Sequence, residues 1–290
     1  MSERVARKGS VLHELYGDTD DIFYLDPFDY LPSTVERAAI DKVEHVIIEG
    51  GDGTVQGVIS EFLRQEDRFA NFPKFSIIPG GMTNQVAKNI GFASASPHRV
   101  KTKLASELSP TNNPLLIASE LDGPDYSGFL FSTGAIPQIT RYTTGQLHRK
   151  GIGGSLAVFG GILKGIRGDD ATLMQLTSVH LDDLYEGEHL GTVITTLPGL
   201  ILGLDPFWGE EEAPLRLTWV TSGYKKLGRN ILGLWLGRKS VDRRKDGIFS
   251  VCRNEINYSY SGPVVLDGEF LSFPSGKFTV RASRPVTFLR

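Results

Sequence analysis

Residues 46–62, VIIEGGDGTVQGVISEF, decide the fold of this chain. A short apolar run over 45–50 stops at glycine and predicts a buried strand. Beyond it, apolar residues recur at the spacing of one helix face: Val55, Val58, Ile59, Phe62 and Leu63. A strand that passes through a glycine-rich turn into a helix is the repeating unit of a parallel sheet with helices on its faces.

The same design recurs further along the chain. Residues 75–81, FSIIPGG, predict a second apolar strand and turn, and Thr83 to Ile90 predict the helix after that turn. Before the first unit, Pro32-Ser33-Thr34 and the stretch 35–44 predict a helix capped near its start, and 21–25 predicts a short strand. These patterns predict a Rossmann-like α/β domain with a parallel sheet.

The pattern changes after residue 114. The segment 94–114 is polar and rich in Pro and Asn near its end, which predicts a domain boundary and domains of 1–114 and 115–290. The second half predicts short strands separated by turn residues and therefore an antiparallel β-sandwich. Helices are expected at 151–167 and 225–237. The predicted strands are 115–121, 126–135, 171–181, 189–197, 215–223, 247–261, 263–273 and 277–283.

Composition excludes several classes of protein. The net charge of -3 provides no general attraction for nucleic acid. The single cysteine, Cys252, excludes an intrachain disulfide, and the six histidines show no zinc-site spacing. Neither a spanning apolar run nor a signal peptide is evident, so we expect a cytoplasmic protein without a transmembrane segment.

The glycine turns suggest an anion site. Ligands of open α/β sheets bind beyond the carboxyl ends of the strands, where a turn without Cβ atoms permits close approach. The start of the next helix favours a phosphate. Asp52 would repel that phosphate unless a cation lies between them, so it indicates magnesium or a base that accepts a proton. Alternatively, Asp52 only shapes the turn or caps the helix.

Four motifs together resemble the diacylglycerol kinase catalytic domain family, which includes bacterial lipid kinases and sphingosine kinases. They are GGDGT at 50–54, PGGMTNQVAKNIGF at 79–92, DGIF at 246–249 and LDGE at 266–269. The resemblance implies ATP and Mg²⁺ as cofactors and an active site in the cleft between the two domains. Its implied nucleotide site contains Gly50, Gly51, Asp52, Gly53, Thr54, Val55, Gln56, Gly80, Thr83, Asn84 and Asp267.

The resemblance also implies roles for carboxylates. Glu269 matches the family's proton acceptor, with Asp52 as the second catalytic residue and Asp267 beside Glu269. Asp246 matches a magnesium position that also uses backbone oxygens of Arg243 and Ile248. From the residues alone, Asp267-Gly268 is equally a hairpin turn, and Thr83 is equally a helix cap.

The implied activity is an ATP- and Mg²⁺-dependent lipid kinase that phosphorylates a hydroxyl of diacylglycerol or a related lipid in phospholipid metabolism. The alternatives are a small-molecule kinase similar to NAD kinases, and a nucleotide- or lipid-binding protein with impaired catalysis. The apolar stretch 195–209 and the apolar–basic stretch 231–245 could meet a membrane peripherally, or could be ordinary core and surface. Whether the protein forms a homodimer is left open by the sequence.

Two departures from the family's pattern affect these expectations. The family's first strand ends in Asn-Pro, and residues 1–10 match only the segment after that strand, so the strand is expected to be cut off or absent. In the second motif, Gln85 stands where the family commonly has Asp, and Lys88 stands near the usual Arg.

Overall fold

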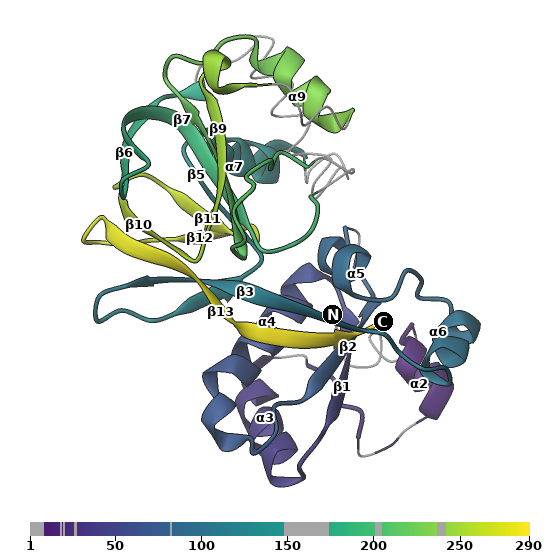
Figure 1. The fold of residues 1–290 in the computed structure, drawn as a ribbon. Helices are drawn as coiled ribbons and strands as arrows, with labels where there is room; N and C mark the ends of the chain where they lie inside the picture. Colours follow the sequence, from purple (N-terminus) through teal and green to yellow (C-terminus); the bar gives the residue numbers. More distant parts are fainter. Residues whose placement is uncertain are drawn as a thin grey trace. The chain divides into compact units, whose positions relative to one another are not determined.

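The computed structural model describes residues 9–17, 19, 21–25, 28–81, 83–147, 174–200, 205–236 and 242–290. The chain forms two compact units (Figure 1), Met1–Asn113 with Pro285–Arg290, and Pro114–Arg284. The predicted helix at 151–167 lies outside the described residues.

The first unit is built on parallel strands. β1 (His45–Gly50) pairs with β2 (Lys74–Pro79) from His45↔Lys74 to Gly50↔Pro79. The end of β13 (Lys277–Leu289) joins them in parallel, with Phe288 opposite Phe75. The last six residues therefore return to the first unit, whereas the sequence pattern groups them with the predicted domain 115–290. The physical reason is that β2 gains a second hydrogen-bonded neighbour and buries Phe288 completely.

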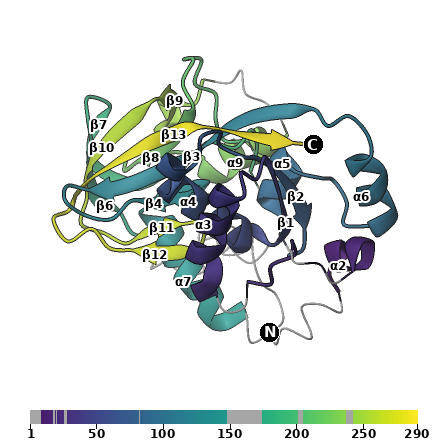
Figure 2. The ribbon, with the colours of Figure 1, turned by 90° about the horizontal axis from the view of Figure 1, so that it is seen from below.

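Helices cover both faces of these strands. Figures 1 and 2 show α3 and α4 on one side, with α2 and α6 on the other. On the second side, Val11 and Val100 pack with Ile78. The helical elements of this unit are α2 (Val11–Tyr16), η1 (Phe28–Tyr30), α3 (Leu31–Ile40), α4 (Asp52–Arg64), η2 (Glu66–Arg68), α5 (Gln85–Ile90) and α6 (Pro97–Leu104).

Aromatic side chains form the centre of this unit's core. Phe75 is fully buried, and the ring centroid of Phe62 lies 5.2 Å from it in an edge-to-face arrangement. Phe288 lies 6.3 Å from the same ring. Such pairs stabilise beyond the area that they bury, so these rings fix α4 and β13 against β2.

Several predicted boundaries are wrong. Residues 21–25 form no strand, and α3 ends at Ile40 instead of continuing to residue 44. The helix after the second glycine turn begins at Gln85, because Asn84 has a left-handed backbone with φ of 49°. The predicted linker 94–114 contains α6, whose Val100 is buried.

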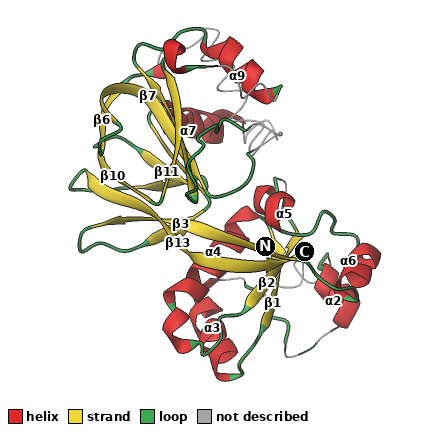
Figure 3. Cartoon of the chain, in the orientation of Figure 1, coloured by secondary structure: helices red, strands yellow, loops and turns green. Residues whose placement is uncertain are grey.

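The second unit is a strand-rich antiparallel structure, as the sequence predicts (Figure 3). From His189 to Thr195, β7 pairs with β8, and it also pairs with β6 and β5. Its strands are β3 (Pro110–Glu120), β4 (Tyr126–Gly128), β5 (Leu130–Thr133), β6 (Thr177–Leu181), β7 (Tyr185–Thr195), β8 (Leu215–Thr221), β9 (Ile248–Arg253), β10 (Glu255–Ser259), β11 (Val264–Leu266), β12 (Glu269–Leu271) and β13. Strands β3 and β13 each run from one unit into the other.

Three helical elements accompany these strands. α9 (Leu227–Trp235) falls within the predicted helix at 225–237. α7 (Ala135–Leu147) comes directly after β5 and was not expected, and η6 (Arg244–Asp246) precedes β9. Within the described residues, none of the helices has both the length and the apolar character that crossing a bilayer requires.

Candidate active site

The two glycine turns of the first unit pack against each other, backbone to backbone. A Cβ atom at Gly80 would lie 3.0 Å from the Cα of Gly50, and one at Gly81 would lie 2.7 Å from the Cα of Gly51. The Gly80 amide also donates to the Gly50 carbonyl at 2.8 Å. These glycines are therefore required by contact between the turns, which the local sequence does not reveal.

Gly53 is different because nothing lies within 4 Å of the position where its Cβ would be. It is exposed in the first turn of α4, which begins at Asp52 after the N-cap Gly51. The first amides of a helix have no partner within it, and they carry the positive end of its dipole. The open space beside Gly53 is where an anion could approach this helix closely.

Asp52 bridges the two turns. Its Oδ1 accepts a hydrogen bond of 2.8 Å from the Val86 amide in the first turn of α5. Asp52 thus caps a helix, but it caps the neighbouring one, a role the local sequence does not reveal. In the described part of the chain, Oδ2 accepts no hydrogen bond, so one oxygen remains for a cation or a proton.

Asn84 shapes the second turn from within. Its Oδ1 accepts from the Gly81 amide at 2.7 Å, and its Nδ2 donates to the Gly81 carbonyl at 2.6 Å. Asn84 is also the N-cap residue of α5, so Thr83 is not that cap. Both side-chain groups of Asn84 are therefore used to hold the turn.

The other residues of α4 predicted for the nucleotide site differ in how deeply they are buried. Thr54 covers Gly50, where an added Cβ would lie 2.7 Å from the threonine Cβ. Val55 is only 1% exposed and belongs to the core. Its side chain therefore packs in the core and helps to hold α4 in place. Gln56, on the same helix, is half-buried.

Two glycine substitutions separate packing from ligand access. Gly81→Ala is expected to destabilise the first unit by about 1–3 kcal/mol because its Cβ would overlap Gly51. If the open space at the helix start holds the expected ATP phosphates, Gly53→Ala keeps stability but weakens ATP binding by about tenfold, because the methyl group occupies that space. Chemical denaturation and nucleotide titration measure the two effects. Equal ATP affinity of Gly53→Ala and the unmodified protein would remove Gly53 from the site.

In the second unit, the LDGE motif forms the hairpin between β11 and β12. Asp267 and Gly268 both have positive φ, 50° and 100°, and Leu266 pairs with Glu269, as in a two-residue hairpin turn. The Asp267 carboxylate accepts 2.8 Å hydrogen bonds from the amides of Phe129 and Leu130. Both of its oxygens therefore accept backbone hydrogen bonds, and the expected action of Asp267 with Glu269 on a metal or proton stays a prediction.

Glu269 itself is exposed at the start of β12. Its neighbour Phe270 is 42% exposed and lies under the guanidinium of Arg141, 5.1 Å from the ring centroid. A carboxylate on a rigid hairpin and open to solvent can meet a substrate hydroxyl, so its geometry is compatible with a base.

The residues predicted to bind a structural magnesium ion have hydrogen-bond partners of their own in the structure, and the ion site stays a prediction. The Asp246 Oδ2 accepts from the Asn230 side-chain Nδ2 at 2.8 Å, and the Arg243 carbonyl accepts from the backbone amides of Asp246 and Ile248. In the described part of the chain, no three histidine, cysteine or acidic side chains gather as they would around a metal ion. Asp246 instead ties η6 to α9 through Asn230, a residue that sequence reasoning did not single out.

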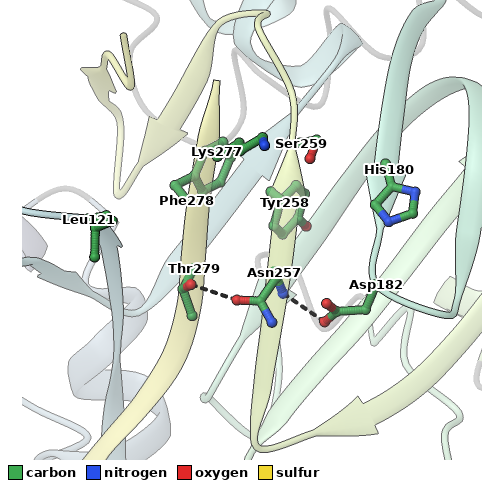
Figure 4. Close-up of a pocket in the computed structure, with 9 residues that line it drawn as sticks. All are labelled: Leu121, His180, Asp182, Asn257, Tyr258, Ser259, Lys277, Phe278 and Thr279. Atoms are coloured by element: carbon green, nitrogen blue, oxygen red, sulfur yellow. Dashed lines mark hydrogen bonds between the residues drawn. The ribbon is translucent and has the colours of Figure 1, made fainter. Parts of the chain in front are cut away.

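A hollow of about 370 Å³ lies on the second unit over β6, β10 and β13 (Figure 4). Three of its polar residues are joined by hydrogen bonds, with the Thr279 hydroxyl donating to the Asn257 Oδ1 and the Asn257 backbone amide donating to Asp182. It contains none of the residues predicted for catalysis. The hollow is lined by Leu121, His180, Asp182, Asn257, Tyr258, Ser259, Lys277, Phe278 and Thr279.

Comparison with known proteins adds independent findings. The family model of the diacylglycerol kinase catalytic domain matches residues 6–112. A protein named "Putative lipid kinase", from Streptococcus pneumoniae serotype 4 (strain ATCC BAA-334 / TIGR4), is 32% identical over 103 residues, which are 36% of this chain. The matched chain spans only 32% of that relative's length.

Solved structures share the fold over most of the chain. A diacylglycerol kinase structure from Bacillus anthracis str. Sterne has a TM-score of 0.58 at 18% identity, covering 89% of this chain and 80% of that one. A second structure from the same organism has a TM-score of 0.59 at 18% identity, covering 89% and 81%. Residues 6–112 of this chain therefore match the diacylglycerol kinase catalytic domain family, in agreement with the resemblance that the motifs predict.

Proposed function

We propose that this chain transfers the γ-phosphate of ATP to a hydroxyl of diacylglycerol or a related lipid. The observation that carries the proposal is the position of Asp52. It stands in the first turn of α4, fixed by the Val86 amide, beside the open space at Gly53. An acid beside an anion site is unfavourable in itself, so its presence favours a nucleotide phosphate that arrives with a cation.

The residues at the start of α4 would bind and orient the phosphates. The first-turn amides donate hydrogen bonds to phosphate oxygens, and the helix dipole favours their charge. Because Asn84 and the contacting glycines hold the two turns, these donors are fixed before the nucleotide binds. Preorganised donors stabilise charge that develops during transfer without a cost of reorganisation.

Magnesium fits Asp52 better than Asp246. Mg²⁺ is usually held by one or two carboxylates, substrate phosphates and waters, and Asp52 has one oxygen without a hydrogen bond in the described part of the chain. When bound, Mg²⁺ would neutralise charge on the phosphates. The Asp52 Oδ1 meanwhile keeps the carboxylate in place through Val86.

Glu269 is the proposed base. Its carboxylate would accept the proton of the lipid hydroxyl while that oxygen attacks the γ-phosphorus, the bond from phosphorus to the bridging oxygen breaks, and ADP leaves. Asp267 serves this step indirectly, because its bonds to Phe129 and Leu130 fix the hairpin that carries Glu269.

The test is transfer of labelled phosphate from γ-labelled ATP with Mg²⁺ to diacylglycerol, monoacylglycerol, ceramide, sphingosine and NAD. Glu269→Gln is expected to lower transfer to the preferred lipid by about 10²–10⁴-fold, because it removes the base. Glu255→Gln is the matched control, since Glu255 is also exposed at the start of a strand in the second unit.

Each outcome of this assay indicates a different function for the chain. Label on a lipid that is lost in Glu269→Gln but kept in Glu255→Gln supports the proposal and names the substrate. Transfer of label to NAD would indicate a small-molecule kinase instead of a lipid kinase. ATP binding without transfer to any acceptor would contradict the proposal and leave a nucleotide-binding protein.

A further inference from the structure

Helix α9 has apolar residues on both of its sides. Leu234 is 4% exposed, and Leu227 packs on the cluster of Ala135, Ile139 and Leu190, so this side belongs to the core. On the opposite side, Leu232 and Leu236 are 51% and 58% exposed. A surface helix normally presents polar residues to water, so the two exposed leucines require a different explanation.

Basic residues lie on the same helix and beside its start. Arg229, Leu232 and Leu236 have the i, i+3, i+7 spacing and share one stripe of the helix. The Lys225 amide donates to the Asp246 carbonyl at 2.9 Å, and this bond places η6, with Arg244 and Lys245, against the start of α9. The α9 surface is defined here as Lys225, Arg229, Leu232, Leu236, Arg244 and Lys245, all of them exposed.

Acidic residues are scarce in this part of the chain. The sequence contains no Asp or Glu from 213 to 241. Of the two acids beside η6, Asp246 accepts from Asn230 and Asp242 accepts from the Arg244 amide. The α9 surface therefore combines exposed leucines with four basic residues that outnumber the two neighbouring acids, Asp242 and Asp246, although the whole chain has a net charge of -3.

We propose that the α9 surface docks on an anionic lipid bilayer. Leucines that enter the boundary of the acyl chains, flanked by lysine and arginine at the headgroups, are the pattern of a helix lying in a membrane interface. Basic residues near such a membrane each contribute favourably through the negative surface potential. This inference rests on the proposed function, because a kinase of diacylglycerol must reach a substrate that resides in a bilayer.

Co-sedimentation of the full chain with vesicles tests the proposal. The vesicles are phosphatidylcholine alone, or phosphatidylcholine with phosphatidylglycerol. We expect binding to the anionic vesicles that weakens with salt. Leu232→Ser with Leu236→Ser should lower this affinity by about tenfold or more, since less apolar surface is buried.

Matched variants separate the α9 surface from general surface properties. Ile40→Ser with Leu121→Ser removes two apolar side chains that are even more exposed, 72% and 90%, and should leave vesicle binding unchanged. Lys225→Gln with Arg229→Gln should weaken binding by about fivefold for each cation removed. The control for charge is Lys101→Gln with Lys103→Gln, two exposed lysines of α6.

Failure of docking and failure of catalysis are distinguishable. Phosphate transfer to a short-chain diacylglycerol in detergent micelles measures catalysis without a bilayer, and the α9 variants should retain it. Loss of vesicle binding with retained micelle activity supports the proposal. Equal losses in the control pairs, equal binding to neutral vesicles, or no vesicle binding by an active protein would overturn it. Vesicle binding without transfer to any lipid would instead contradict the proposed function.

Discussion

Replacement of Asp52 by Asn is expected to lower phosphate transfer by about 10³-fold or more while the protein stays folded. The side chain keeps its shape, and the amide oxygen can still accept the Val86 amide hydrogen bond. The change removes the negative charge that would hold a cation beside the phosphates. It therefore separates the structural role of Asp52, which is visible in the structure, from its proposed chemical role.

Rates of transfer at saturating ATP and lipid, with chemical denaturation in parallel, measure the two roles. Asp67→Asn is the control, because it makes the same change of charge at an exposed position of the same unit. Loss of activity together with a large loss of stability would show that Asp52 is mainly a cap for α5. Full activity of a stable Asp52→Asn protein would contradict the proposed magnesium site.

Acid is expected to destabilise the second unit through His189, which has no solvent exposure. The ring Nδ1 lies 2.7 Å from the Thr177 carbonyl, and a carbonyl can only accept, so Nδ1 carries the proton. Nε2 then accepts from the Thr133 hydroxyl at 3.0 Å. Thr192 donates to Thr133 at 2.8 Å, and Tyr258 donates to Thr192 at 3.0 Å. This series of hydroxyl donors ends at Nε2, which can accept a hydrogen bond only when His189 is neutral.

Protonation of His189 would reverse this chain of hydrogen bonds in a buried site. Burial lowers the pKa of His189 below its ordinary value of 6.5 and raises the pKa of Tyr258. Below pH 6.5 His189 binds a proton in the unfolded protein but stays neutral in the folded protein. The free energy of unfolding therefore falls as the pH falls. The loss approaches about 1.4 kcal/mol per pH unit until the folded-state pKa is reached.

Denaturant unfolding between pH 5 and 8, monitored by tryptophan fluorescence, measures this loss. The tryptophans are Trp208, Trp219 and Trp235, all in the second unit, so the signal reports that unit. His189→Gln should be less stable at pH 8 and should lack the histidine-dependent slope below pH 6.5. The exposed His98→Gln should keep that slope. An unchanged slope in His189→Gln would assign the acid response to another group.

Local patterns predict much of the fold and only part of the candidate site. The switch of hydrophobic period at Gly50 predicts β1 and α4 because burial of each face requires that spacing. α7 was missed because its sequence, AIPQITRYTTGQL, contains β-branched residues and a proline that favour strands and turns. Here tertiary contacts override propensity, since Ala135 and Ile139 are buried.

The site depends on contacts between distant residues. Asp52 bonds to an amide 34 positions away, and Asp267 bonds to amides 137 and 138 positions away. No local spacing reports such contacts. The motifs therefore predict which residues gather around the turns, but not that Asp267 is occupied by the backbone.

The place of residues 285–290 beside β2 has a consequence for synthesis on the ribosome. β2 contains Phe75, and its neighbour Phe288 is translated more than 200 residues later. Until then one edge of the parallel strands has unpaired backbone groups, and such edges invite association with other chains. Removal of residues 285–290 is thus expected to yield a nascent protein that depends on chaperones and aggregates when they are limiting, although every residue before Asn113 is intact.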